Sequence, residues 1–579
     1  MARKRAGKNE RTQQTGPEMT AEERAELDAR LAHMLHAPLK SDLGNGRFFL
    51  LWAARDENNS VRTRIWNPET EQELREANFF YDAAHGLGAF TKRVARGQTV
   101  RRSATETALI NAILRSRDDE NGYLVYADYL TENGDTQGDF IRLCTEMQRL
   151  KPDAPAHEAK NERIAELVDA HAEEWFDPLE VLGLRPQLVG KFAPWLWLSD
   201  KYGVIDAVAV DRPGLLPGNA NRLFAAAPFL RKLTFEKGHV APDLGKVKQL
   251  TQIEELNFTH ADLTAEALEK IVRSKHLTGL KALHLYGNEI GHAGVHALTE
   301  WPGLGRLETL DLTRCDTGPE AVVELARCEN TSHITRLRLG HNSIDGDAVR
   351  AVLGSPHLGR LIELDLAGAD FDHVAAFHFH TSASSKTLQQ IDLDSATFTA
   401  LAFGHFTRCH LPALEFLKLN NVRLRAQEAA YLSSAAFAGT LTALFFDNCG
   451  LGAAGAQALL ESTFPTLATL DLSRNRLTNR GGLALAHAAL SLPALTSLKL
   501  WDNKLGPSAI TALAESPLLA NLTELDINDN KIGPAGATAL AKSQYLKHLK
   551  TLTVDEKTVG MKGKWALLDR FGESVIGWR

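Results

Sequence analysis

Residues 495–505 read LTSLKLWDNKL, and this stretch decides the fold because its pattern recurs along the chain. The pattern is LxxLxL, with leucine or a close substitute at each L position. Its copies begin mostly 27 residues apart, otherwise 23, 26 or 28, at positions 230, 253, 280, 307, 334, 361, 388, 414, 441, 467, 495, 522 and 549. Such regularity predicts a solenoid, in which each unit buries its apolar face against its neighbours.

Each unit is expected to contain one strand and one helix. LxxLxL alternates apolar and polar residues, which is typical of a short strand with one buried face. A segment such as IGPAGATALAKSQYL, from residue 532, then places alanine and leucine at helical spacing. The predicted fold class is therefore α/β, with a parallel inner sheet and outer helices.

This pattern resembles the leucine-rich repeat family, in its long ribonuclease-inhibitor-like form, over residues 230–579. The resemblance implies about 13 repeats in a curved horseshoe, a cap at the C-terminal end, and a concave face that binds protein ligands. KWALLDRFGESVIGWR, from residue 564, is expected to be the closing helix and strand.

A polar or thiol side chain follows the strand pattern in the better copies, three residues after its last leucine. We expect each asparagine amide to satisfy backbone groups that stacking would otherwise bury unpaired. The residues at this position are Asn288, Cys315, Asn342, Cys449, Asn475, Asn503 and Asn530.

Three middle copies depart from this rule, with Ala369, Ala396 and Val422 at the same position. In these copies the alanine-rich helix pattern is replaced by FDHVAAFHFHTSASSKT, from residue 371. We therefore expect the middle repeats to be less regular than the others. His378 and His380 within it could suggest a metal site. No matching acid or cysteine cluster accompanies them, so we predict a structural role and no metal or cofactor.

Strand alternation also predicts which side chains leave the core for the concave face. The face is expected to be acidic, interrupted by cations and aromatic rings. Aromatic anchors among charges are what a protein-binding hot spot needs, although aspartates can also be ordinary soluble strand residues. The predicted protein-binding residues are Tyr286, Arg338, Asp392, Asp394, Phe416, Lys418, Phe445, Asp447, Asp471, Lys499, Trp501 and Asp526.

Residues 106–150 have helical periodicity and resemble the bacterial repeat-companion domain. The resemblance rests on LVYADYL from residue 124 and GDTQGDFI from residue 134, where Tyr129 replaces the usual tryptophan. Asp128, Asp135 and Asp139 could be calcium ligands, but their order is not that of an EF-hand loop, which favours a polar turn with capping acids. Residues 151–229 are expected to be a helical linker and the N-terminal cap of the solenoid.

Residues 45–105 suggest a strand pair followed by a helix. Their position and order resemble a WGR domain, with Ile65, Trp66 and Asn67 in place of its signature triplet. Relatives of that fold contact DNA ends, which the altered triplet does not support here. Residues 1–44 are expected to be a basic tail and a helix, partly disordered.

The chain of 579 residues has a net charge of −7, so it has no global positive field for nucleic acid or an anionic membrane. Nucleic acid would bind only through the N-terminal region. Five cysteines without regular spacing favour a reducing compartment. With no secretory signal and no apolar run approaching about 18 residues, the sequence predicts a cytoplasmic protein without membrane association.

The sequence contains no GxxxxGK[ST], HExxH or GxSxG motif, so we predict no enzyme activity. The first hypothesis is a non-catalytic scaffold that holds a protein partner on the concave face. The second is a sensor or regulator in a bacterial signalling or defence system, whose N-terminal region recognises a ligand or effector. The third is an inhibitor or activator of an enzyme in trans.

Overall fold

The computed structural model describes the backbone of four early strands and most of the chain from residue 102 onward. The described residues are 39–44, 47–55, 61–67, 72–74, 102–150, 155–180, 184–186, 202–210, 214, 216–235 and 242–579. Three segments lie outside them: the basic tail with Arg3, Lys4, Arg5 and Lys8, the helix expected before residue 101, and all of residues 187–201. The chain divides into two compact units, one mainly before residue 184 and one mainly after residue 204.

The first unit contains a four-stranded antiparallel sheet in the order β1-β2-β3-β4. Its strands are β1 Leu39–Gly44, β2 Arg47–Arg55, β3 Val61–Asn67 and β4 Gln72–Leu74. The strand pair expected in this region corresponds to β2 and β3, which pair from Leu50 with Trp66 to Arg55 with Val61.

The helical pattern that follows forms three short helices and one long one. They are α3 Ala104–Arg115, α4 Glu120–Glu132, α5 Gln137–Met147 and α6 Pro155–Glu180. Ser103 and Asp119 cap the first two by accepting backbone hydrogen bonds. Gly138 lets α5 approach α4, because a Cβ there would lie 2.5 Å from the carbonyl oxygen of Ala127. Asp128 bonds Arg142 at 2.5 Å.

The second unit is built around a 16-stranded sheet, the longest among the described residues. Its first pair, β5 and β6, is antiparallel, and every later pair is parallel. The strands are β5 Leu184–Pro186, β6 Ala207–Val210, β7 Lys232–Phe235, β8 Glu255–Asn257, β9 Ala282–His284, β10 Thr309–Asp311, β11 Arg336–Arg338, β12 Glu363–Asp365, β14 Gln390–Asp392, β16 Phe416–Lys418, β17 Ala443–Phe445, β18 Thr469–Asp471, β19 Ser497–Lys499, β20 Glu524–Asp526, β21 Thr551–Val554 and β22 Ile576–Trp578.

The strands pair so that equivalent residues of successive repeats are neighbours. Leu470 pairs with Leu498, and Leu498 pairs with Leu525. These leucines are at most 2% exposed, while their neighbours Lys499 and Asp526 are half-buried. The predicted alternation is confirmed for these strands.

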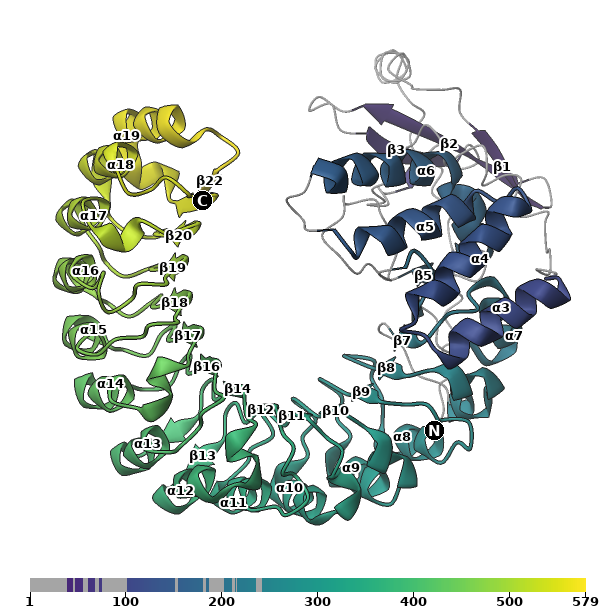
Figure 1. The fold of residues 1–579 in the computed structure, drawn as a ribbon, viewed down its shortest axis with the longest axis horizontal. Coiled ribbons are helices and arrows are strands. Elements are labelled where there is room, and N and C mark those ends of the chain that lie inside the picture. The colour runs from purple at the N-terminus through teal and green to yellow at the C-terminus, as the bar shows by residue number, and fades with distance from the viewer. Residues whose placement is uncertain are drawn as a thin grey trace, which may run out of the picture. The chain divides into compact units, whose positions relative to one another are not determined.

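Helices cover the opposite side of the array, as Figure 1 shows for the teal, green and yellow part of the chain. They are α7 Leu216–Ala226, α8 Ala265–Val272, α9 Gly291–Thr299, α10 Gly318–Arg327, α11 Gly346–Leu353, α12 His373–Thr381, α13 Ala400–Thr407, α14 Ala426–Ser433, α15 Gly452–Leu459, α16 Thr478–Ala486, α17 Pro507–Ala514, α18 Gly533–Lys542 and α19 Glu556–Phe571. Short 3₁₀ turns complete several repeats: η2 Pro242–Lys246, η3 Lys248–Gln252, η4 Pro302–Arg306, η5 Glu329–Thr331, η6 Ala383–Lys386, η7 Ala436–Gly439 and η8 Pro517–Leu519.

The asparagine position forms a buried ladder between repeats. Asn503 Oδ1 accepts from the backbone N–H of Asn475 and Leu477, at 3.0 and 3.2 Å. Its Nδ2 donates to the carbonyls of Leu472 and Trp501, at 2.7 and 3.3 Å. The predicted role of this amide is thus confirmed at Asn503, which is fully buried.

The middle repeats differ from the rest, although their strands stay in register. The segment from residue 371 does form a helix, α12, and two extra strands, β13 Asp370–Phe371 and β15 Thr397–Phe398, pair beside it. Phenylalanine rings fill the interior there: Phe371 stacks on Phe398 with centroids 4.5 Å apart, and Phe379 contacts Phe406 at 5.2 Å. Backbone hydrogen bonds occur where the asparagine amide is missing: the N–H of Thr397 donates to the carbonyl of Ala369 at 3.0 Å.

Candidate functional site

The inner surface of the array consists of the outward side chains of the parallel strands and of the turns directly after them. We call it the concave face. All twelve residues predicted to bind protein lie on it and all are half-buried. Some of them contact one another: Lys418 lies against Asp392 and Asp394, and Phe416 lies against Phe445.

The aromatic part of this face starts with two phenylalanines on adjacent strands. Phe416 opens β16 and Phe445 closes β17, and their ring centroids are 4.9 Å apart. Because both rings leave the sheet on its outward side, they form a small apolar step between charged neighbours.

Trp501 lies further along the same face, within a bonded group of charges. The guanidinium of Arg474 is 5.1 Å from the indole centroid, and Trp501 Nε1 donates to Asp529 at 2.5 Å. Arg474 also holds Asp447, with its Nε donating to Oδ1 at 2.7 Å. We call Phe416, Phe445, Asp447, Arg474 and Trp501 the aromatic cluster. Its three rings are half-buried.

An acidic group occupies the middle of the face. Lys418 Nζ lies 2.9 Å from Asp392 and 3.5 Å from Asp394, and so bridges both carboxylates. Burial, and then the Asp392 carboxylate, raise the pKa of Asp394. Burial lowers the pKa of Lys418, but its bonds to the two aspartates outweigh this and raise it.

Asp365 is the most perturbed carboxyl of this group and was not among the twelve predicted residues. It pairs in register with Asp392 across β12 and β14. Burial, and then the charge of Asp392, raise the pKa of Asp365 to about 7. Gly340 makes room for it, because a Cβ at that position would lie 2.8 Å from both carboxylate oxygens of Asp365.

Arg338, at the end of β11, and Tyr286, just after β9, have separate partners. Arg338 donates to Glu363 at 2.6 Å and lies 3.5 Å from Asp311. Although burial opposes it, these acids raise the pKa of Arg338. The ring of Tyr286 meets that of His260 edge-on, with centroids 4.8 Å apart.

The remaining predicted residues have local partners. Asp471 and Asp526 each accept a hydrogen bond from the backbone N–H two residues later, and burial raises the pKa of both. Lys499 lies 3.6 Å from Glu524. These three side chains lie on the concave face and are held by hydrogen bonds or ion pairs within their own or a neighbouring repeat.

Arg474 and Asp529 were missed by sequence reasoning because they follow the strands. Both have left-handed backbone conformations, with φ of 54° and 52°, and strand alternation does not apply there. The sequence feature that could have identified them is the recurrence of polar residues two positions after the last leucine of LxxLxL.

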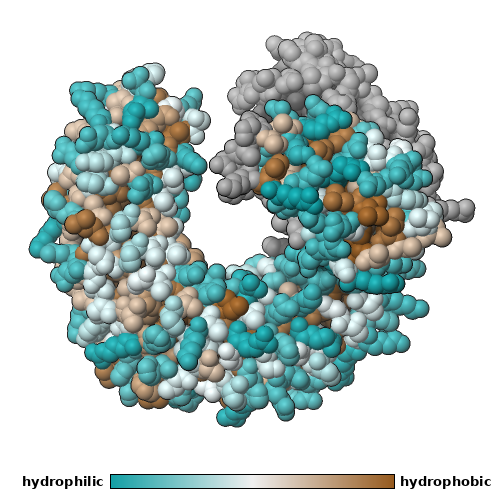
Figure 2. Space-filling model, viewed as in Figure 1, coloured by the Kyte–Doolittle hydropathy of each residue, from teal (hydrophilic) through white to brown (hydrophobic). Residues whose placement is uncertain are grey.

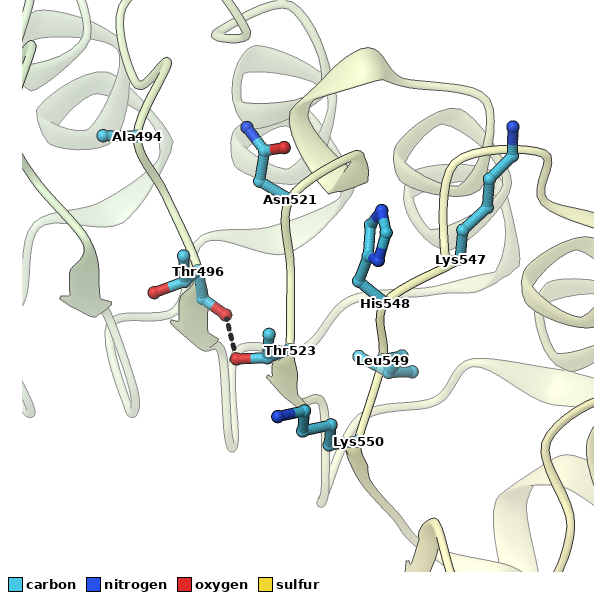
Figure 3. A pocket seen from close by; sticks show the side chains of 8 residues that line it. All are labelled: Ala494, Thr496, Asn521, Thr523, Lys547, His548, Leu549 and Lys550. Atoms are coloured by element: carbon cyan, nitrogen blue, oxygen red, sulfur yellow. Dashed lines mark hydrogen bonds between the residues drawn. The ribbon is translucent and has the colours of Figure 1, made fainter. Parts of the chain in front are cut away.

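Figure 3 shows a shallow hollow at the amino ends of β19–β21, where Lys547 and Lys550 extend in different directions and Thr523 Oγ1 donates to the Thr496 carbonyl at 3.2 Å. No group of three or more His, Cys, Asp or Glu side chains within the described ranges is arranged to hold a metal ion. On α12, the Nδ1 atom of His378 is buried without a hydrogen-bond partner.

Comparison with known proteins bears on the fold. Residues 465–486 and 519–541 match the family described as Leucine Rich repeat. The array has the leucine-rich repeat fold. The matched residues include β18 with α16 and β20 with α18, and these leucine-rich repeats share strand register with the others.

Two solved structures are similar to this chain. The yeast Rad7 and Elc1 complex has 14% sequence identity and a TM-score of 0.40, covering 74% of this chain and 98% of that one. An internalin from Listeria monocytogenes has 15% identity and a TM-score of 0.28, covering 56% of this chain and 72% of that one. No curated protein matches the sequence.

Proposed function

We propose that this protein is a non-catalytic interaction scaffold, whose leucine-rich repeats hold a protein partner on the concave face. The observation that supports it most is the aromatic cluster. Phe416 and Phe445 are partly exposed rings packed against each other on adjacent strands, and the partly exposed ring of Trp501 lies against Arg474. Preorganised aromatic anchors bind with little further loss of side-chain entropy.

The charges around the anchors define the kind of partner. The middle of the face carries Asp365, Asp392 and Asp394 with Lys418 as the shared cation. A partner with cationic side chains beside an apolar anchor would complement it, and like-charged partners would be repelled. The described helices include none long and apolar enough to cross a membrane.

The test compares the full chain with the double variant Phe445→Ala/Trp501→Ala in affinity purification from the native host. Loss of both anchors is expected to weaken the main partner at least tenfold, since each hot-spot ring contributes about 2 kcal/mol or more. Leu490→Ala is the matched control, because Leu490 is 89% exposed and lies outside the cluster. Equal recovery of the partner by the double variant would refute the proposal and favour recognition by the N-terminal unit.

A further inference from the structure

The outer surface of the array carries an apolar patch on two neighbouring helices. Val374 and Phe377 of α12 are 41% and 47% exposed, and Leu401 of α13 is 58% exposed. Figure 2 shows brown residues on the outer rim at the level where Figure 1 labels α12 and α13. We call these three residues the outer patch.

The outer patch is additional to what the core requires. The inward sides of the two helices already bury Phe379, Phe403 and Phe406, and a surface helix needs only one apolar side. Equivalent positions in the flanking repeats are polar: Asp347 stands two residues after the N-cap of α11, and Gln427 two residues after that of α14. From α8 to α15, the exposed large apolar side chains lie on α12 and α13, and the next ones along the array are Leu483 of α16 and Leu490.

Cationic and titratable side chains border the outer patch. The ring of Phe377 lies 5.8 Å from that of His380 and 6.1 Å from that of His405. Arg408 is exposed, one turn beyond His405 and on the same side of α13 as Leu401. A negatively charged partner would find two imidazoles and a guanidinium beside three apolar contacts.

Neither α12 nor α13 contains an acidic residue. Between residues 373 and 414 the sequence contains only Asp392 and Asp394, and both of these lie on the concave face beside Lys418. Asp372, just before α12, accepts from the backbone N–H of Ala375 and from Arg350, both bonds within the fold. The nearest exposed acid on α11, Asp347, also pairs with Arg350, so the unpaired charge pattern of α12 and α13 complements an acidic ligand.

We propose that the outer face of α12 and α13 docks an acidic amphipathic segment of a partner protein. Apolar side chains of the segment seat against Val374, Phe377 and Leu401, and its carboxylates face His380, His405 and Arg408. The surface is separate from the concave face, so the array binds two ligands of opposite charge preference.

The probe is a phage-displayed library of random helical peptides, selected on the full chain and then depleted on Phe377→Ser/Leu401→Ser. All three side chains of the patch are exposed, so the variant should keep its thermal unfolding midpoint, which is measured alongside. We expect the peptides that distinguish the two proteins to carry Asp and Glu with Leu or Phe at helical spacing. Discriminating peptides that are basic or uncharged, or the absence of any discriminating peptide, would overturn the proposal.

One selected peptide, labelled for fluorescence anisotropy, tests the contacts. Its affinity should fall about tenfold or more in Phe377→Ser/Leu401→Ser, should fall with added salt, and should weaken in Arg408→Glu. Leu490→Ser is the matched exposed control and Phe445→Ala/Trp501→Ala the concave control, and both should bind as the wild type does. Patch-dependent binding to phosphatidylglycerol vesicles in place of peptide, or patch-dependent self-association in sedimentation, would reject a protein segment as the occupant.

Discussion

Asp365 shows how an ordinary strand residue becomes unusual through its neighbours. Its side chain lies opposite Asp392 in the sheet and is partly covered, and these two effects raise its pKa to about 7. Two adjacent carboxylates with one shared environment tend to keep one proton between them. Asp365 is therefore partly protonated near neutral pH, while the unfolded chain releases that proton near pH 4.

This raised pKa predicts how stability depends on pH. The folded state holds a proton that the unfolded state loses, so the contribution of Asp365 is present at low pH and is lost as pH rises from about 4 to 7. Asp365→Asn keeps the neutral form, so the variant should match the wild type near pH 4. At pH 8 it should exceed the wild type by at most about 4 kcal/mol, because the pKa of Asp365 is raised from 3.8 to about 7 and each unit corresponds to about 1.4 kcal/mol.

Denaturant unfolding of both proteins across this pH range measures the difference. Asp394, Asp471 and Asp526 titrate in both proteins and cancel in the comparison. A stability difference that does not change with pH would contradict the assignment.

At the scale of single elements, the asparagine ladder links neighbouring repeats on either side of the middle ones. Asn503→Ala removes four hydrogen bonds of a fully buried amide and leaves backbone groups unpaired. We expect a loss of about 2–4 kcal/mol, measured as a lower midpoint of denaturant unfolding. Asn521→Ala is the matched control, since Asn521 is exposed and makes one bond, to the Pro493 carbonyl. A comparable loss in both variants would show that the ladder has no special role.

The elements also show how far sequence reasoning reaches. The leucines of LxxLxL and the position of Asn503 were predictable because a fixed period repeats a fixed environment. The helix α12 and the stacked rings of Phe371 and Phe398 were not predictable. These phenylalanines pack in an environment that the other repeats do not share, so the repeat period carries no information about them. The position of Arg474 was missed since a left-handed residue leaves the strand's alternation.

At the scale of the whole molecule, the cysteines report on the opening of separate repeats. Cys315, Cys409 and Cys449 are buried, whereas Cys144 and Cys328 are partly exposed. Burial raises the pKa of Cys315 and Cys409 to about 12, so thiolate, the reactive form, is scarce at pH 8. Iodoacetamide should modify Cys144 first and Cys328 next, and the buried three only after repeats open.

Peptide mass spectrometry over time measures this order, with denatured protein as the control in which all five react alike. Joint labelling of the buried three would show one cooperative array. Early labelling of Cys409 alone would show that the middle repeats open separately, and labelling of Cys409 at the rate of Cys144 would contradict the burial described above.

The two layers of each repeat have different natural spacings. Neighbouring strands lie about 4.8 Å apart, whereas packed helices need about 8–10 Å, so every added repeat turns the array by a small angle. Glycines allow neighbouring outer helices to pack closely. A Cβ at Gly482 would lie 2.6 Å from the Cβ of Ala509, and a Cβ at Gly563 would lie 2.7 Å from the Cβ of Ala537. The curvature of the array therefore depends on how closely its outer helices pack. The width of the concave face, and so the size of a ligand that fits there, depends on outer residues that the ligand does not contact.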